Sequence, residues 1–362
     1  MSKPSIREVE ESALSEWLKS HNQPAFRAKQ IHDWFFSKMA TSFDDMVNVP
    51  KALREELAQD FTACSLTPSS VLRADDGTVK WASELFDGAK VETVLIRAPE
   101  RGTVCISTQV GCPVRCAFCE SGRLGFVRNL KTVEIIDQVI IASRELGRRI
   151  DNVVVMGTGE PMFNLDNLIP ALNYLCDMEN GLGISARNIT VSTSGIPNGI
   201  RRLADQHRPW NLALSLHAPN DRIRSQLIPE KNRHRIAEIL EACAEYRETT
   251  GRMITFEYVL IDGMNASEGN ARDLARLAHL AHAKVNLIPL NNSSTTWKAP
   301  QKEQCQKFLE VLTASGLQAT IRLRKGDKIK AACGQLVAKK SQENPDSPKK
   351  DTKTPKGIRN NG

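Results

Sequence analysis

The sequence predicts an α/β protein: a partial (βα)6 barrel, preceded by a small helical domain and followed by a disordered basic tail. Between residues 103 and 324, six short apolar runs each precede a segment of helical spacing, and a seventh run follows. Such alternation predicts a parallel sheet with right-handed crossovers. A closed barrel of this kind has eight units, so six units predict an open one. The composition also changes at both ends of this region.

Each expected strand is a short apolar run: 103–110, 152–157, 188–193, 210–216, 253–261, 284–290 and 318–324. The expected helices carry apolar residues at helical spacing: 132–147, 164–178, 198–206, 234–249, 268–282 and 300–315. Along the first of these helices, Ile135, Ile136, Val139 and Ile140 fall on one face. A helix with one apolar face packs that face against a sheet.

The chain divides into four regions. Residues 1–65 contain two segments of helical spacing and are expected to form an N-terminal helical domain. Residues 66–102 read as short strands joined by turns, a β-rich extension. Residues 103–337 are expected to form the barrel core. Residues 338–362 are rich in Lys and Pro, cannot bury a core, and are expected to be disordered.

Composition narrows the class of protein. Hydrophobic residues make up 41% and charged residues 25%, as in soluble globular proteins. No apolar run reaches the length of a membrane span, and the acidic N-terminus fits neither a signal nor a transit peptide. Nine cysteines, three of them in a metal-ligand spacing, favour a reducing compartment, the cytoplasm. The net charge is +7, mostly from the tail, which is weak evidence for nucleic acid.

Three cysteines follow the first expected strand. Cys112, Cys116 and Cys119 stand in a C-x3-C-x2-C spacing, and Cys105 precedes them. Three thiolates on one short loop can reach one soft metal centre, and a four-iron cluster held by three ligands keeps one iron open for reaction. The motif resembles the signature of the radical S-adenosylmethionine (SAM) superfamily.

A zinc knob and buried, unligated cysteines are the alternatives to an iron–sulfur cluster. A structural zinc site is closed by a fourth Cys or His, and no histidine lies between His32 and His207. Spacing alone does not decide between a cluster and these alternatives. The polar residues at the other strand ends favour the cluster.

Active sites of parallel barrels gather on the loops after the C-terminal ends of the strands. The unusual polar residues of this chain fall there: Gly157 to Pro161, Ser192 to Ser194, Ser215 to His217, and Asn291 with Asn292. The glycines of GTGEP allow a ligand to approach the backbone closely. Glu160 and carbonyl groups of this turn can hold the ammonium group of SAM. Each of these motifs alone also fits an ordinary turn or a buried histidine.

Together the motifs resemble one family. GCPVRCAFC, GFVRNL, GTGEP, VSTSG, SLHAPND, NLIPLN and DKIKAACGQL are similar, in order and spacing, to the RlmN/Cfr family of radical SAM RNA methyltransferases. The resemblance covers about residues 20–337 and is closer to RlmN. AACGQL, around Cys333, discriminates best, because other radical SAM enzymes lack it.

The resemblance implies roles for individual residues. Cys333 corresponds to the cysteine that becomes S-methylated, Cys105 to its resolving partner, with which it forms a disulfide, and Glu92 to the proton acceptor. The SAM-contacting positions are matched by Gly159, Glu160, Ser192, Ser215, Leu216, His217 and Asn291. The cluster ligands are matched by Cys112, Cys116 and Cys119. By its strand pattern alone, Glu92 is expected on a solvated face.

The implied reaction methylates an adenine ring carbon, which is electron-poor and cannot be reached by ordinary methyl transfer. One SAM methylates Cys333, and a second SAM, cleaved at the [4Fe-4S] cluster, provides a radical that activates this methyl group for addition to the ring. Glu92 then removes the ring proton, and Cys105 attacks the Cys333 sulfur to release the product. The implied target is an adenosine of 23S rRNA, with C2 favoured over C8, and a tRNA adenosine beside the anticodon is a second candidate.

The implied partners are RNA and an electron donor such as flavodoxin. Basic residues before Cys333 are expected to contact phosphates: Arg322, Arg324, Lys325, Lys328 and Lys330. Arg222, Arg224, Arg233 and Arg235 are expected to add to them. The target adenine must leave its stack to be reached.

Three alternatives remain at this stage. A C8-specific, Cfr-like enzyme differs only in the target carbon. A radical SAM enzyme that merely abstracts hydrogen has no use for Cys105 and Cys333, and a non-enzymatic cysteine–metal RNA-binding protein needs no SAM residues. The chain departs from the RlmN pattern at Glu120-Ser121-Gly122, at Thr158 and in the loop after Asn291, none of them an expected catalytic position.

Overall fold

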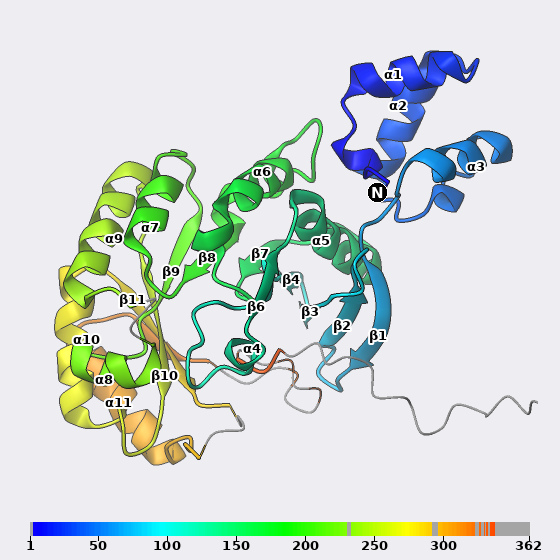
Figure 1. Cartoon of the computed structure of the whole chain (residues 1–362). Coiled ribbons are helices and arrows are strands. Elements are labelled where there is room, and N and C mark those ends of the chain that lie inside the picture. Colours follow the sequence, from blue (N-terminus) through cyan, green and yellow to red (C-terminus); the bar gives the residue numbers. More distant parts are fainter. Residues whose placement is uncertain are drawn as a thin grey trace, which may run out of the picture.

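The computed structural model describes residues 3–229, 233–291, 296–322, 326, 329, 331 and 334–336. Its main sheet consists of β1 (Thr67–Arg73), β2 (Val79–Glu84), β3 (Lys90–Ala98), β4 (Arg101–Cys105), β7 (Asn152–Val155), β8 (Ile189–Thr193), β9 (Asn211–Ser215), β10 (Thr255–Leu260), β11 (Lys284–Pro289) and β12 (Ala319–Ile321). The ten strands lie in this same order across the sheet. Neighbours from β4 to β12 are parallel. The predicted open, partial barrel is confirmed (Figure 1).

Helices cover the outer face of the parallel strands (Figure 1). They are α5 (Thr132–Leu146), α6 (Leu165–Cys176), α7 (Pro197–Ala204), α9 (Ile236–Thr250), α10 (Glu268–Leu280) and α11 (Lys302–Ala314). The apolar stripe of α5 packs on the sheet, with Ile135, Val139 and Ile140 fully buried. Gly147 follows this helix in the left-handed conformation, φ 76°, and ends it. The barrel core therefore lies between the sheet and these helices.

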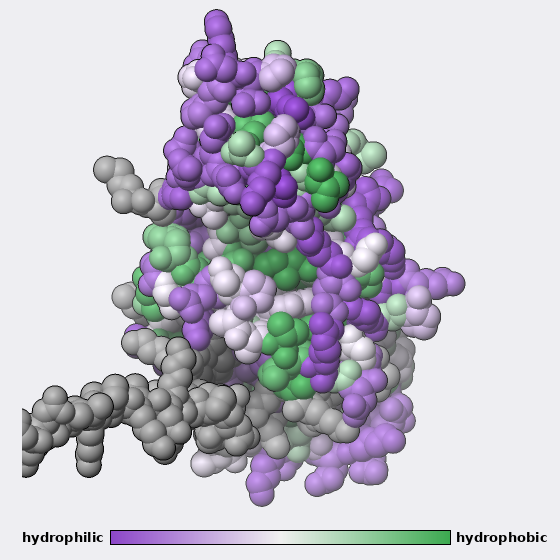
Figure 2. Space-filling model, turned by 90° about the vertical axis from the view of Figure 1, so that its right-hand side faces the viewer, coloured by the Kyte–Doolittle hydropathy of each residue, from purple (hydrophilic) through white to green (hydrophobic). Residues whose placement is uncertain are grey.

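The N-terminal region forms a helical domain with a core of its own. It contains η1 (Ile6–Glu8), α1 (Glu11–Ser20), α2 (Phe26–His32), η2 (Asp33–Ser37), η3 (Phe43–Asp45) and α3 (Lys51–Asp60). Leu18, Phe35 and Leu57 are fully buried within it. Its outer surface is mostly hydrophilic in the view from this side of the molecule (Figure 2).

Two ion pairs attach this domain to α5. The Arg7 Nη1 to Asp137 Oδ1 distance is 2.9 Å, and both side chains are fully shielded from solvent. Arg144 reaches Asp45 at 2.9 Å from the other direction. Because breaking a fully buried ion pair leaves an uncompensated charge, Arg7 and Asp137 oppose separation of the domain from the barrel.

The structure differs from the sequence-based expectation at two places along the sheet. The strand expected over residues 103–110 is two strands, since β4 ends at Cys105 and β5 (Gln109–Gly111) pairs with β6 (Phe126–Asn129) in a separate two-stranded sheet. The chain leaves the main sheet because the polar groups of Ser107 and Thr108 bond to the turn after β7. Residues 66–102, expected as a β-rich extension, form strands that continue the main sheet in antiparallel pairing, which the sequence did not indicate.

Two short helices near the cysteines were not expected. They are α4 (Glu120–Arg123) and α8 (Asp221–Leu227). The tail 338–362 lies outside the described residues, so its expected disorder stays a prediction. Among the residues that are described, no helix is long and apolar enough to cross a membrane.

Candidate active site

A pocket opens at the C-terminal ends of the parallel strands. The empty space within it, its open mouth included, is about 1090 Å³. The cysteine loop, the ends of β7 to β11 and the chain after β12 provide its walls. This is where barrels of parallel strands carry their active sites.

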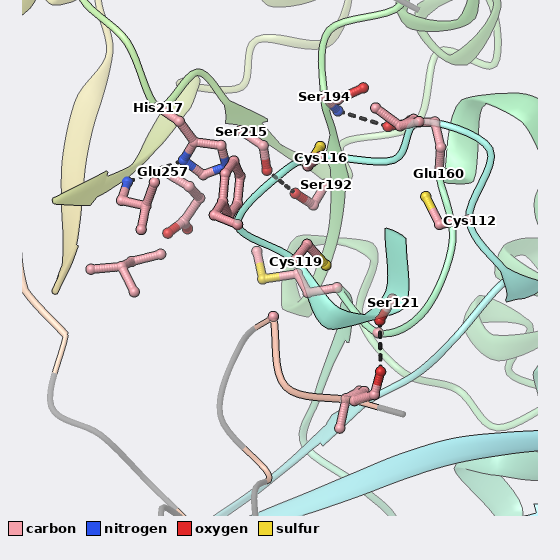
Figure 3. A pocket seen from close by; sticks show the side chains of 18 of the residues that line it. Cys112, Cys116, Cys119, Ser121, Glu160, Ser192, Ser194, Ser215, His217 and Glu257 are labelled. Carbon is pink, nitrogen blue, oxygen red and sulfur yellow. Dashed lines mark hydrogen bonds between the residues drawn. The ribbon is translucent and has the colours of Figure 1, made fainter. Parts of the chain in front are cut away.

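Cys112, Cys116 and Cys119 all line this pocket (Figure 3). Three backbone hydrogen bonds fix the loop. Within it, Cys119 N donates to Cys116 O at 3.1 Å. Cys112 N donates to Gly125 O at 3.0 Å, and Ala117 N donates to Leu227 O at 2.9 Å. Burial raises the pKa of the Cys112 thiol to about 12 and raises the pKa values of the other two. Without a metal these thiols are therefore neutral, and thiolate formation requires a bound cation.

The donor set fits an iron–sulfur cluster better than a single zinc ion. Within the described residues, no three His, Cys, Asp or Glu side chains gather around the position of one ion. The three thiols instead border one wider space, and the described part of the chain adds no fourth ligand of the kind that closes a structural zinc site. A cubane cluster is larger than an ion and is held by thiolates. The set of residues thus fits a cluster with one iron left open.

The glycine turn after β7 lies directly on the segment that follows β4. Gly159 has φ +114°, and a Cβ there would lie 2.7 Å from the Gln109 side chain. Glu160 follows, almost fully buried, with Oε1 accepting from Met162 N at 3.1 Å and Oε2 from Ser194 N at 2.7 Å. Burial raises the pKa of Glu160, and the two backbone amides partly offset that rise. The carboxylate is oriented by two fixed donors at the pocket wall (Figure 3).

Two serines and a histidine come from the neighbouring strand ends. Ser192 and Ser215 are hydrogen-bonded to each other at 3.2 Å, on β8 and β9. His217 Nδ1 accepts from Val259 N at 3.1 Å, so its neutral ring carries the proton on Nε2. Burial lowers the pKa of His217 to about 3. His217 therefore remains neutral. Its ring is contacted edge-on by Phe118 of the cysteine loop, with 4.8 Å between the ring centroids.

The last two expected SAM positions differ in placement. Asn291 lines the pocket after β11. Leu216 is fully buried, and its N–H donates to Glu257 O at 3.1 Å. Its side chain does not line the pocket in the described part of the chain, so any contact with a ligand there would have to come from its backbone.

Glu92 is buried, not solvated as the strand pattern indicated. Its side chain is 5% exposed and forms an ion pair with Lys80 of β2 at 3.1 Å. The strand pattern was misleading because the partner cation comes from another strand. Cys105 lies on the same face of the sheet, since it pairs with Val94, two residues beyond Glu92. The structure therefore brings two of the expected catalytic residues to one face of β3 and β4.

Cys333 lies outside the described residues, but residues on both sides of it are described. Ala331 and Leu336 pack in one apolar cluster with Cys105 and Val94. Glu120 N donates to Gly334 O at 2.9 Å, and Ser121 Oγ donates to Leu336 O at 2.8 Å. The described residues on either side of position 333 thus contact the start of α4, directly after the cysteine loop, and pack against Cys105.

One charged residue of the pocket, Glu257, was missed by the sequence reasoning. Glu257 on β10 is 3% exposed and lines the pocket. Its Oε1 pairs with Arg322 at 3.1 Å and accepts from Asn286 at 3.0 Å, whereas Oε2 has no hydrogen-bond partner among the described residues. A lone carboxylate inside the fully buried run TFEYVL was the available signal.

The expected phosphate contacts need one correction. Arg224 is fully buried in α8 and cannot reach RNA on the surface. Arg322, expected at a phosphate, lines the pocket beside Glu257. Arg222 and Arg235 are exposed, as expected for such contacts. The other basic positions named before Cys333, namely 324, 325, 328 and 330, lie outside the described residues.

Comparisons with known proteins agree with this geometry. Residues 106–275 match the family "Radical SAM superfamily", and residues 5–62 match "Ribosomal RNA large subunit methyltransferase N-terminal domain". The chain is 44% identical over 329 residues to a protein of Symbiobacterium thermophilum named "Probable dual-specificity RNA methyltransferase RlmN", covering 89% of this chain and 88% of the relative. A Staphylococcus carnosus protein of the same name is 42% identical, with 94% of each chain covered.

A solved structure resembles the whole chain. The crystal structure of a radical SAM methyltransferase from Sphaerobacter thermophilus superposes with a TM-score of 0.86 at 43% identity. The match covers 93% of this chain and 100% of that chain. The likeness therefore includes the helical N-terminal domain as well as the barrel.

Proposed function

Because the chain belongs to the RlmN family of radical SAM RNA methyltransferases, we propose that it methylates an adenosine of 23S rRNA, with C2 the favoured ring carbon. The observation that carries the proposal is the placement of Cys105 and Glu92 on one face of the sheet, beside the segment that surrounds Cys333. A tRNA adenosine is the second proposed substrate, supported by the dual specificity in the relatives' names.

Cys112, Cys116 and Cys119 would hold a [4Fe-4S] cluster in the pocket. This cluster, with SAM and an electron from a donor such as flavodoxin, supplies a radical able to take hydrogen from a methyl group. The chain uses two SAM molecules per turnover, one as the source of the methyl group and one as the source of the radical. The fixed carboxylate of Glu160 and the neighbouring backbone of Gly159 bind the SAM ammonium group.

The other strand-end residues orient the rest of SAM. Ser192 and Ser215 present hydroxyl groups from β8 and β9. His217 presents an Nε2 donor, because Val259 N already occupies Nδ1. Asn291 presents its side-chain amide from the end of β11, and Leu216 offers a backbone group. Rigid strand ends hold these groups in place before the ligand arrives, which favours a reactive geometry.

The cysteine pair and Glu92 carry out the transfer to RNA. Cys333 carries the methyl group as a thioether and joins it to the adenine ring carbon. Glu92, paired with Lys80, accepts the proton that the ring carbon loses. The electron left unpaired by the radical addition returns to the electron carrier. Cys105 then attacks the Cys333 sulfur and the sulfur–carbon bond breaks, the released carbon takes up a proton to become the methyl group of the product, and a disulfide remains between the two cysteines.

The test is mass spectrometry on cluster-loaded protein incubated with SAM, together with nucleoside analysis of a 23S rRNA transcript. The proposal expects one added methyl group on the Cys333 peptide and 2-methyladenosine in the RNA. C333A should abolish RNA methylation while the cluster and SAM cleavage persist. Detection of 8-methyladenosine would show that the target carbon is C8 and not C2. An unmodified Cys333 peptide in active enzyme would eliminate the relay.

A further inference from the structure

Arg224 is a buried cation that forms no ion pair with any of the described residues. It lies on α8, and its side chain is fully buried. Nη2 donates to Ser194 O, and Nη1 donates to His234 O at 3.1 Å. Both acceptors are neutral backbone carbonyls, and Nε has no partner among the described residues. Within that part of the chain, no carboxylate pairs with this guanidinium.

Burying a charge without a counter-charge is strongly unfavourable. The burial of Arg224 lowers its pKa to about 10, and Arg224 in turn helps to keep His217 neutral. The nearby Asp221 is exposed and accepts a hydrogen bond from Ile236 N at 3.0 Å. Glu160 already accepts two backbone amides. Both carboxylates and Cys116 attract Arg224 electrostatically and oppose the fall in its pKa, but within the described residues neither carboxylate forms an ion pair with the guanidinium.

The elements around Arg224 lead to the cysteine loop. Leu227, three residues further along α8, accepts from Ala117 N at 2.9 Å, between Cys116 and Phe118. Ile223 and Leu227 pack in one cluster with Cys112 and Cys116. On the other side, Arg224 donates to Ser194 O, and Ser194 and Cys116 both line the pocket (Figure 3). Arg224 thus lies directly behind the loop that carries the thiols.

We infer that Arg224 is the counter-charge of the iron–sulfur cluster and raises its reduction potential. The inference rests on the proposed function, since it requires a cluster on Cys112, Cys116 and Cys119. A four-iron cluster held by three thiolates is a net anion, and accepting one electron adds another negative charge. A fixed cation at short range in a dry site stabilises the reduced form more than the oxidised form. Arg224 acts through the cluster and is a positioning residue.

The test compares R224M, which removes the charge, with R224K, which keeps it. R222M is the matched control, because Arg222 is exposed on the same helix and its loss changes the net charge equally. Iron and sulfide content are measured first. The clusters are then reduced stepwise with dithionite, and each cluster accepts one electron. The reduced fraction is followed by electron paramagnetic resonance.

At a fixed potential, R224M should lower the ratio of reduced to oxidised cluster about tenfold, which corresponds to about 59 mV. R224K and R222M should stay within about twofold of the wild type. An R224M titration equal to the wild type, with full iron content, would overturn the inference and leave the proposed function intact. A shift in R224K as large as in R224M would also overturn it, because hydrogen bonding rather than charge would then be the cause.

A second measurement separates this role from a purely structural one. The cluster-free protein has an uncompensated cation, so cluster-free R224M and R224Q should unfold at a temperature no lower than the cluster-free wild type. Cluster loading should then stabilise the wild type more than either variant. Failure of both neutral variants to fold contradicts the inference. Full iron retention after loss of Cys116 in C116A would instead remove the proposed cluster site, and the inference with it.

Discussion

Two buried carboxylates lie on opposite halves of the same sheet, and each pairs with a cation from a neighbouring segment. Glu92 on β3 pairs with Lys80 of β2, and Glu257 on β10 pairs with Arg322 after β12, both at 3.1 Å. In the first pair the side chains are 8% and 5% exposed, whereas in the second Arg322 is 35% exposed. Glu257 lines the pocket. Glu92 is not among the described residues that line it, and it lies on the same face of the sheet as Cys105.

The different positions of the two carboxylates suit two different functions. Leu336 both lines the pocket and packs on Cys105, so it stands between the cofactor side and the cysteine side. A carboxylate on the cofactor side can contact SAM. On the proposed function, a carboxylate beside Cys105 can exchange a proton with the RNA base that is bonded to Cys333. The following predictions test this separation, from the largest expected effect to the smallest.

Removing the charge of Glu92 should have the largest effect. On the proposed function, E92Q loses the proton acceptor, and general base catalysis contributes about 10²–10⁴-fold. RNA methylation should fall by about that factor, while the affinity for SAM stays within about twofold of the wild type. Single-turnover methylation and equilibrium SAM binding check both points. A large loss of SAM affinity in E92Q would contradict the separation of the two sides.

The two cations should differ in what their loss does to stability. K80M removes one partner of a buried ion pair, which should lower the free energy of unfolding by about 3–5 kcal/mol. R322M leaves Glu257 at the open pocket, where it still accepts a hydrogen bond from Asn286, so the loss of stability should be smaller. Urea unfolding of both cluster-free variants measures the difference. Equal losses would mean that the two pairs are equally buried in solution.

The helices, the parallel strands and the pocket position were predictable because apolar periodicity and strand-end polarity are local properties of the sequence. The membership of the RlmN family was likewise predicted and is confirmed. Glu92 was misjudged because its partner Lys80 comes from another strand, so its burial depends on strand pairing. Arg224 was misjudged for a related reason: α8 packs behind the cysteine loop, a contact that only the folded chain creates.

On the pocket side, the expected effect concerns SAM binding. Glu257 Oε2 lines the pocket and has no hydrogen-bond partner within the described residues. A hydrogen bond to a charged acceptor contributes about 1.5–3 kcal/mol, so E257Q should weaken SAM binding about 10- to 100-fold. Isothermal titration of cluster-loaded protein measures this, with E92Q as the matched control. Unchanged SAM affinity in E257Q would remove Glu257 from the cofactor contacts.

The smallest effect is a pH dependence of stability. Burial raises the pKa of Glu257 above its ordinary value, although Arg322 opposes the rise. Between the unfolded and the folded pKa values, the folded protein binds more protons, so the contribution of Glu257 to stability is lost as pH rises through that window. E257Q lacks this loss. The free energy of unfolding of E257Q minus that of the wild type should therefore increase with pH. The increase should be about 1.4 kcal/mol for each unit by which folding raises the pKa of Glu257.

Urea unfolding of cluster-free protein between about pH 4 and pH 7 measures this difference, and E248Q, at an exposed position on α9, controls for the loss of one carboxylate. Taking the difference from the wild type at each pH cancels the titration of all other groups. A difference that decreases with rising pH would mean that Arg322 outweighs burial and holds the pKa of Glu257 below its ordinary value. The two carboxylate pairs would then be electrostatically alike, and only their position relative to Leu336 would distinguish them.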